Sequence, residues 1–246
     1  MKAVLRSILP KNLISELSFL RDYSLFPEKY RGKFVNQSFS QEGEDVLLKR
    51  IFDIRKKYRG FYVDVGAHHP YRYSNTYLFY RKGWSGINID AMPDSMKAFN
   101  KVRARDINLE IPISDKKQVL TYYAFNEPAL NGFSKELSEK RDGHDNFKLL
   151  FTKDIETFTL EEILDQYLPK DQTIDFLSVD VEGLDFEVIR SINLEKYKPK
   201  VILAEILRNS LSNLDQNPML GYLEGYGYSV MAKTVNTAFF IHEDFK

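Results

Sequence analysis

Strand-like runs alternate with helix-like segments along most of this chain, which strongly limits the folds that it can adopt. Runs rich in β-branched and aromatic residues are separated by segments whose apolar residues fall at helical spacing. Parallel strands need a crossover, usually a helix, so this alternation predicts an α/β fold: a mostly parallel sheet with helices on both faces. The expected strands are residues 61–66, 86–90, 109–113, 119–125, 174–181, 201–206, 228–235 and 238–242. The expected helices are residues 40–54, 74–81, 93–103, 160–167 and 186–192.

The ends of this pattern suggest how the chain is organised. Residues 1–37 are expected to form a helical lead-in, and residues 38–246 a single folded domain. Ser40 is expected to cap the first helix of that domain. Residues 126–152 are polar and poorly periodic, which indicates an insertion or a mobile lid. The last two strands are separated by two polar residues, which predicts a terminal antiparallel hairpin.

Four of the expected strands end in an acid: Asp64, Asp90, Asp180 and Glu205. A carboxylate is costly to bury unless it is paired, so four acids at corresponding positions need an explanation. Ligands of open α/β sheets bind beyond the carboxyl ends of the strands. We therefore expect the functional site at this edge of the sheet.

Composition excludes several classes of function. Lys and Arg number 35, as do Asp and Glu, so the chain lacks the positive charge that attracts nucleic acid. With no cysteine, disulfides and thiolate nucleophiles are excluded, and a reducing cytoplasm is the expected location. No apolar run approaches the roughly 20 residues of a transmembrane helix, so no membrane span is expected.

The turn after the first expected strand indicates which cofactor fits. A dinucleotide-binding turn carries three glycines, whereas Gly66 is the only glycine in residues 64–70. S-adenosylmethionine has no phosphate and needs a single close backbone approach. Asp64 suits its cationic methionine end, and Asp90 suits the ribose diol. A nucleotide-sugar or dinucleotide oxidoreductase, and a non-catalytic binding module of the same fold, remain alternatives.

Several motifs together resemble the FkbM family of S-adenosylmethionine-dependent methyltransferases. They are residues 40–45, 63–70, 74–76, 83–90 and 175–183. The resemblance implies a class I methyltransferase fold with a seven-stranded sheet. It also implies O-methylation, commonly of polysaccharide sugars or natural products. The cofactor-binding residues that it implies are Gln41, Asp64, Gly66, Ala67, Asn75, Asp90, Ile113 and Ser114.

Methyl transfer to an oxygen requires alignment of the acceptor and removal of its proton. Asp180 or Glu182 can act as the base, or can orient His68 or His69 in the turn after the first strand. Alternatively Asp180, Glu182 and Glu205 supply oxygen ligands for Mg²⁺ or Mn²⁺. A purely structural alternative for Glu182 is capping of the following helix. The expected partner is a small-molecule or glycan acceptor, and a homo-oligomer is left open.

Overall fold

The computed structural model describes residues 35–52, 58–206 and 211–245. Its contacts divide the chain into two units, Met1–Gln37 and Ser38–Lys246. The fold described below is that of the second unit. The helical lead-in predicted over residues 1–37 lies almost entirely outside the described residues.

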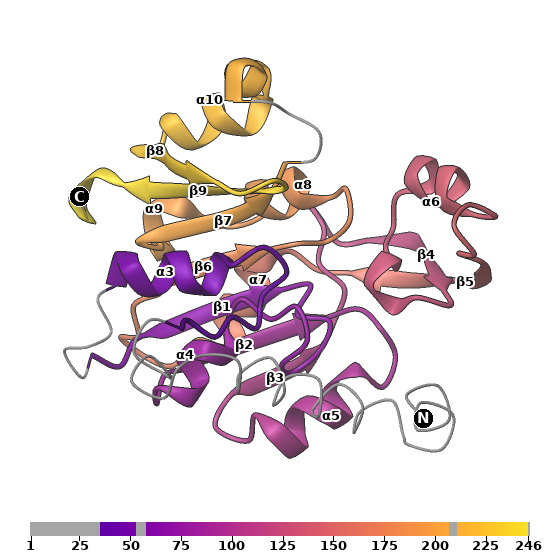
Figure 1. The fold of residues 1–246 in the computed structure, drawn as a ribbon, viewed down its shortest axis with the longest axis horizontal. Helices are drawn as coiled ribbons and strands as arrows, with labels where there is room; N and C mark the ends of the chain where they lie inside the picture. Colours follow the sequence, from indigo (N-terminus) through magenta and orange to yellow (C-terminus); the bar gives the residue numbers. More distant parts are fainter. Residues whose placement is uncertain (1–34, 53–57, 207–210, 246) are drawn as a thin grey trace, which may run out of the picture. The chain divides into compact units, whose positions relative to one another are not determined.

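A seven-stranded sheet forms the centre of this unit, with strand order β3-β2-β1-β6-β7-β9-β8 (Figure 1). The strands are β1 (Phe61–Val65), β2 (Ser85–Asp90), β3 (Ile107–Glu110), β6 (Phe176–Val179), β7 (Val201–Glu205), β8 (Tyr228–Lys233) and β9 (Thr237–His242). The first five of the order are parallel, and β9 runs antiparallel to both of its neighbours. This confirms the predicted mostly parallel sheet with a terminal hairpin.

The strand order reverses next to β1. Val63 of β1 pairs with Ile87 of β2 on one side and with Leu177 of β6 on the other. The chain therefore runs outward through β2 and β3, and later returns to the opposite side of β1. Open α/β sheets bind their ligands at the carboxyl ends of the strands beside such a reversal.

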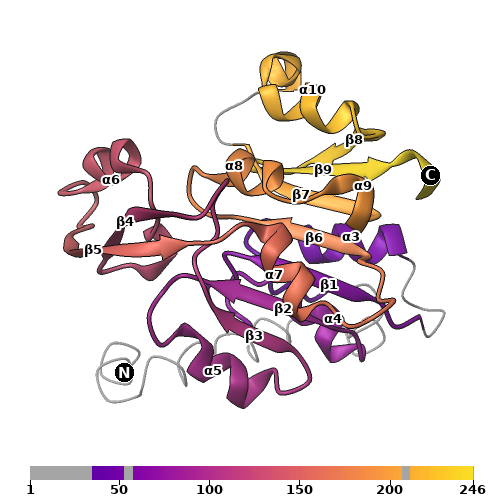
Figure 2. The same ribbon diagram turned by 180° about the vertical axis from the view of Figure 1, so that it is seen from behind.

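Helices cover both faces of the sheet. They are α3 (Glu44–Phe52), α4 (Tyr77–Arg81), α5 (Ser95–Val102), α6 (Lys135–Arg141), α7 (Leu160–Tyr167), α8 (Asp185–Arg190), α9 (Leu194–Tyr197) and α10 (Pro218–Glu224). Single 3₁₀ turns are η3 (Pro128–Leu130), η4 (Leu211–Gln216) and η5 (Glu243–Phe245). Helix α3 lies in front of the sheet in Figure 1, and α7 and α9 lie in front of it in Figure 2. Across the described part of the chain, no helix has both the length and the apolar character needed to cross a membrane.

Alternating side chains of the strands build a separate apolar layer on each face. Val63 and its same-face neighbours pack with apolar residues of α7, α8 and α10. Tyr62, which points the other way, packs with Leu48 of α3 and Phe79 of α4. Burial on both faces explains why these strands consist of nearly continuous apolar runs.

The first helix begins later than its sequence predicts. Helix α3 starts at Glu44, and the carbonyl of Gly43 accepts the first helical hydrogen bonds. Gly43 has φ +90°, a left-handed conformation that a helix cannot include. Ser40 lies outside the helix, but its Oγ accepts a hydrogen bond from the backbone N–H of Asp45 in the first turn at 3.3 Å, as expected of a capping side chain. Its hydroxyl donates to the Asp45 carboxylate at 3.0 Å.

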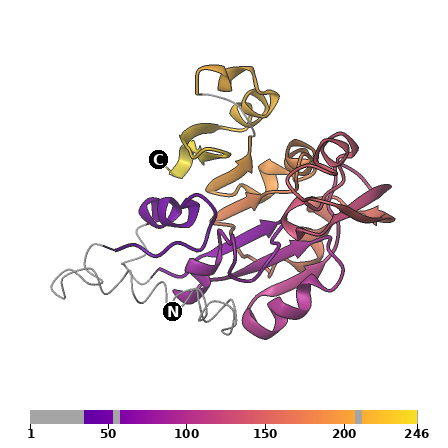
Figure 3. The ribbon, with the colours of Figure 1, turned by 45° about the vertical axis from the view of Figure 1, so that its right-hand side comes forward.

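The predicted insertion is more ordered than its sequence indicates. Strand β4 (Gln118–Phe125) pairs with β5 (Leu149–Thr157) in a second, two-stranded antiparallel sheet. Residues 126–152 thus contain η3, α6 and the start of β5, so the segment expected to be an insertion or a mobile lid has regular secondary structure. Most side chains of β5 are exposed, so the strand lacks the alternation of apolar residues that would have revealed it. Figure 3 shows this ribbon and α6 beside the seven-stranded sheet.

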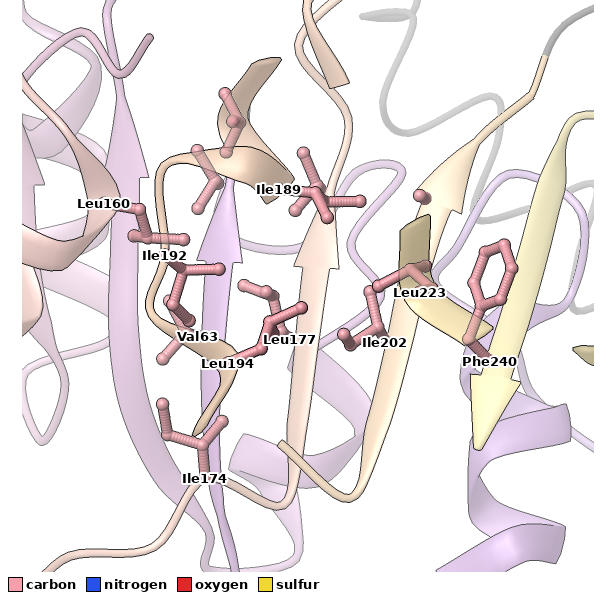
Figure 4. Packing of buried hydrophobic residues seen from close by; sticks show 14 of the residues in the cluster. Val63, Leu160, Ile174, Leu177, Ile189, Ile192, Leu194, Ile202, Leu223 and Phe240 are labelled. Atoms are coloured by element: carbon pink, nitrogen blue, oxygen red, sulfur yellow. The ribbon is translucent and has the colours of Figure 1, made fainter. Parts of the chain in front are cut away.

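The larger apolar layer is continuous from β1 to β9. Figure 4 shows Val63, Leu177 and Ile202 on neighbouring strands, with Phe240 of β9 at one end. Leu160 of α7 and other helical residues cover these side chains. This layer fixes the mutual positions of the strands whose carboxyl ends form the site.

Arg103 ties the turn after β1 to the sheet through a buried polar network. Its side chain is fully buried and donates from Nε to Asp106 at 2.9 Å. Its other nitrogens donate to the hydroxyl of Tyr62 at 2.7 Å and to the carbonyl of Pro70 at 2.9 Å. The Pro70 carbonyl belongs to the turn that follows Gly66, so this network holds the turn in place.

We predict that Arg103→Leu lowers the free energy of unfolding by about 3–5 kcal/mol, because Asp106 is left buried without its cation. Urea denaturation monitored by circular dichroism measures the change. The matched control is Arg105→Leu, since Arg105 lies at the exposed surface two residues away, donates to carbonyl oxygens and stacks on the ring of Tyr80, but pairs with no buried acid among the described residues. A loss of similar size in the control would contradict this account of Arg103.

Candidate functional site

A cavity opens at the carboxyl ends of β1, β2, β6 and β7. Its floor includes Gly66 and Asp90, which follow or end β1 and β2. One part of its wall consists of residues 180–182 and Glu205, and another part comes from residues 128–133 of the insertion. The two parts meet at Gly132, where a Cβ would lie 3.1 Å from the Cβ of Glu182. The cavity therefore lies where the reversal of strand order predicts a ligand.

Gly66 brings the ends of β1 and β6 into direct contact. It has φ +83°, and a Cβ at this position would lie 1.7 Å from the carbonyl oxygen of Asp180. Its own N–H donates to the carbonyl of Ile89 on β2 at 2.9 Å. The positive φ and the contact with the Asp180 carbonyl each exclude a side chain at this position. Glycine is therefore required where the two backbones approach.

Asp90 fixes the loop that follows Gly66 and faces the cavity. Its two carboxylate oxygens accept hydrogen bonds from the backbone N–H groups of His68 and Met92, each at 2.7 Å. Burial raises the pKa of Asp90. Each oxygen retains a further lone pair, so the carboxylate can also accept hydrogen bonds from a ligand.

The two histidines of the turn have different surroundings. His68 lines the cavity, and its buried Nε2 has no hydrogen-bond partner among the described residues. Burial, reinforced by Arg72 and His69, lowers the pKa of His68 to about 4. His69 does not line the cavity, and its Nδ1 accepts a hydrogen bond from the N–H of Arg72 at 3.1 Å. His68 is therefore a weak base. His69 makes its hydrogen bond within the turn and does not reach the cavity.

Four of the cofactor-binding residues implied by the family resemblance lie away from the cavity wall. Asp64 is buried and accepts a hydrogen bond from Thr76 at 2.9 Å, and burial raises its pKa to about 6. Ala67 packs with Met96 and Phe99. Ser114 is buried beside Gln118. Asn75 lines a smaller hollow next to the cavity, while Gln41 lines both spaces.

Asp180, Glu182 and Glu205 give the cavity a strongly acidic wall. Burial and the nearby charges of Glu205 and Glu182 raise the pKa of Asp180 well above its usual range. The pKa of Glu205 is also raised, mainly by burial and by the charge of Asp185. One oxygen of Glu205, Oε2, is buried with no partner among the described residues. Asp180 is open to the cavity and makes no hydrogen bond to the residues that the structure describes.

The predicted metal site at Asp180, Glu182 and Glu205 is not formed. Within residues 35–52, 58–206 and 211–245, no group of three or more acid or histidine side chains is placed to hold a metal ion. The reason is the position of Glu182, whose backbone adopts φ +55° and whose carboxylate pairs with Arg141 at 2.6 Å. The pairing directs this carboxylate to Arg141 of the insertion.

The capping alternative for Glu182 is also not observed. Helix α8 begins at Asp185, and its N-terminal region is held by the Asp185 carboxylate. This carboxylate accepts from the N–H groups of Val181 at 3.3 Å and Gly183 at 3.2 Å.

The cavity also has an apolar part. Its side chains are Ile89, Met92, Ile111, Ile113 and Tyr122. The predicted contact residue Ile113 is among them. An apolar surface next to the Asp90 carboxylate suits a flat ring attached to a sugar with free hydroxyl groups.

The insertion contributes residues to the cavity. Asn131 and Phe133 line it, and Arg141 of α6 supplies a cation that pairs with Glu182 of the acidic wall. A second ion pair joins Glu127, at the start of η3, to Arg72 in the turn after β1 at 3.3 Å. The polar, weakly periodic sequence of the insertion does not predict these two ion pairs, because each pairing is set by the three-dimensional fold.

Comparison with known proteins gives one match. A family described as the methyltransferase FkbM domain matches residues 64–230, which is more than half of the chain. No curated protein and no solved structure matches the chain significantly. The matched region contains Gly66, Asp90 and the acidic wall.

We predict that Gly66→Ala destabilises the protein much more than Gly143→Ala does. Both glycines have φ near +80°, but nothing lies within 4 Å of a Cβ at Gly143. The Gly143 variant should lose about 1–2 kcal/mol from backbone strain alone, and Gly66→Ala should lose several more from collision with Asp180. Chemical denaturation of both variants measures the difference, and equal losses would contradict the close approach of β1 and β6.

We predict that Glu205→Gln stabilises the unliganded protein at pH 8 and has little effect at pH 5. A carboxyl whose pKa is raised by folding favours the folded state only while protonated, so stability falls as pH rises from the unfolded pKa through the folded one. Allowing for solvent screening, the gain at pH 8 should be about 1–2 kcal/mol. Urea denaturation at both pH values measures it, with Glu224→Gln at an exposed position as the control. A gain that is equal at both pH values would contradict charge repulsion as the cause.

Proposed function

The chain belongs to the FkbM methyltransferase family and is a methyltransferase, and we propose that it uses S-adenosylmethionine to methylate a hydroxyl group of a sugar or a similar small molecule. The observation that carries this proposal is the combination of groups around one cavity. Asp90 and the apolar side chains line the same cavity as the carboxylate of Asp180, which makes no hydrogen bond to the described residues.

The residues present fit this cofactor. Ile111, Ile113 and Met92 would contact the adenine, and Asp90 would accept hydrogen bonds from the ribose hydroxyls. The acidic wall favours the positively charged methionine end. When bound, S-adenosylmethionine supplies an electrophilic methyl group on a cationic sulfur. Asp64, which is buried and bonded to Thr76, would support the turn below the cofactor instead of contacting it.

Asp180 is the residue that we assign as the proton acceptor. A carboxylate becomes a stronger base when its pKa is raised, and the pKa of Asp180 lies above its usual range because of burial and the charges of Glu205 and Glu182. The lowered pKa of His68 makes that side chain a poorer base. Asp180 would hold the acceptor hydroxyl by a hydrogen bond and remove its proton as the oxygen attacks.

The oxidoreductase alternative is less well supported. A dinucleotide needs several backbone N–H groups close to its pyrophosphate, and the turn after β1 contains Gly66 alone. His68 and Tyr73 occupy the rim of the cavity beyond this turn. Calorimetric titration of the protein with NAD⁺ and with S-adenosylhomocysteine distinguishes the two functions. We expect binding of the second compound only.

We predict that Asp90→Ala weakens the binding of S-adenosylhomocysteine by about 10- to 100-fold, because hydrogen bonds to a charged group are lost. Isothermal titration calorimetry measures the affinity. Glu110→Ala is a matched control, since Glu110 ends the adjacent strand in register with Asp90 but does not line the cavity. Unchanged affinity in Asp90→Ala, with the protein still folded, would refute the assigned ribose contact.

A transfer assay tests the reaction itself. Purified protein is incubated with S-adenosylmethionine carrying a labelled methyl group and with a set of glycan precursors. We expect label in an ether linkage on one of the sugars, and strongly reduced transfer by Asp180→Asn. Label on a nitrogen or carbon atom would overturn the assignment of a hydroxyl acceptor.

A further inference from the structure

The loop between β6 and α8 carries the proposed base and has an unusual backbone. Asp180 begins this loop directly after β6, and its carboxylate makes no hydrogen bond to the residues that the structure describes. The position of this carboxylate therefore depends on the backbone around it. Glu182 has φ +55° and Gly183 has φ +101°, so two consecutive residues are left-handed. A left-handed conformation costs energy at a residue other than glycine, and it persists only where neighbouring groups hold it.

The sheet and α8 hold the main chain of this loop. The N–H of Asp180 donates to the carbonyl of Val65 on β1 at 2.9 Å. At the other end, the Asp185 carboxylate accepts from the N–H groups of Val181 at 3.3 Å and Gly183 at 3.2 Å. These contacts fix the backbone at both ends of the loop and leave the side chain of its strained residue to another partner.

Arg141 of the insertion supplies that partner. One terminal nitrogen of Arg141 donates to the Glu182 carboxylate at 2.6 Å, and the other donates to the carbonyl of Leu130 in η3 at 3.3 Å. The side chains of Arg141 and Glu182 are only 21% and 17% exposed. An ion pair that is shielded from solvent is stronger than an exposed one. A single guanidinium thus joins the loop of the proposed base to a segment of the insertion that lines the cavity.

Two glycines allow the insertion to lie directly on this loop. A Cβ at Gly132 would lie 3.1 Å from the Cβ of Glu182. A Cβ at Gly183 would lie 2.7 Å from a methyl group of Leu137 in α6, which is too close for a side chain. The insertion therefore contacts two consecutive residues of the loop, and displacement of the insertion should also displace the loop.

We propose that Arg141 is a positioning residue for methyl transfer, and that through Glu182 it holds the loop from which Asp180 reaches the acceptor. The inference rests on the proposed function, because it takes Asp180 as the proton acceptor. Loss of Arg141 releases the strained residue, and the loop then relaxes from the geometry needed for proton removal. A displacement of about 1 Å at a reacting group can lower the rate by about 100-fold.

Arg141 also lines the cavity, so direct contact with a bound molecule is the competing role. The geometry favours positioning, since both terminal nitrogens of Arg141 already donate to protein oxygens. A contact residue would change the affinity for a bound molecule, whereas a positioning residue would change the rate at which the bound complex reacts. The two roles therefore predict different kinetic effects.

Hydrogen exchange measured by mass spectrometry tests the support of the loop. In Arg141→Gln, we expect the amides of residues 180–183 to exchange about tenfold faster than in the unaltered protein, because a contact that limits local opening is lost. Lys140→Gln is the matched control, since Lys140 is the preceding residue of α6 and forms an exposed ion pair with Glu136. Exchange in the control should equal that of the unaltered protein. Unchanged exchange in Arg141→Gln would overturn the proposal.

Kinetics with a glycan precursor that is labelled in the transfer assay separate the two roles. We expect Arg141→Gln to lower kcat by about 10- to 100-fold, with little change in KM or in the affinity for S-adenosylhomocysteine. Arg141→Lys should retain most of kcat, because the pair with Glu182 uses a single N–H donor. A raised KM with unchanged kcat would show direct binding and contradict positioning. If the unaltered protein transfers no methyl group, the proposed function fails, whereas the exchange experiment still decides whether Arg141 holds the loop.

Discussion

The close approach of β1 and β6 is the constraint on which the site depends. These strands are neighbours in the sheet although more than a hundred residues separate them in the chain, and they touch where Gly66 meets the carbonyl of Asp180. A larger residue at Gly66 would force the strand ends apart. The same contact places the turn after β1 beside the acidic wall. The proposed cofactor-binding turn and the proposed base Asp180 therefore meet at this one contact.

Charge is distributed in a way that follows from this arrangement. Acids from three strands converge at one rim, and their burial together raises the pKa values of Asp180 and Glu205. Repulsion between these carboxylates is unfavourable for the unliganded fold, and a cationic ligand relieves it. The buried cation of Arg103, in contrast, donates hydrogen bonds to several oxygens and so holds the turn after β1 in position.

The sequence predicted the features that depend on local pattern. Strands with buried faces, the helix over 160–167 and the terminal hairpin were found because apolar periodicity marks them. Strand β5 was missed because its side chains face solvent, and the start of α3 was misplaced because Gly43 interrupts the helix. At the site, Gly66 and Asp90 were placed correctly at the strand ends. Asp180 faces the cavity, whereas Asp64 faces the buried hydroxyl of Thr76. This difference depends on side-chain direction, which the spacing of residues alone does not give.

The two-stranded ribbon has a consequence for how this kind of protein can diversify. Most side chains of β5 lie outside the apolar layers, while residues 128–133 between its strands form a wall of the cavity. The ribbon meets the rest of the site through two ion pairs, Arg72 with Glu127 and Arg141 with Glu182. Substitutions in this segment can therefore reshape one side of the cavity while the central sheet keeps its packing, so that recognition of new molecules can evolve separately from folding.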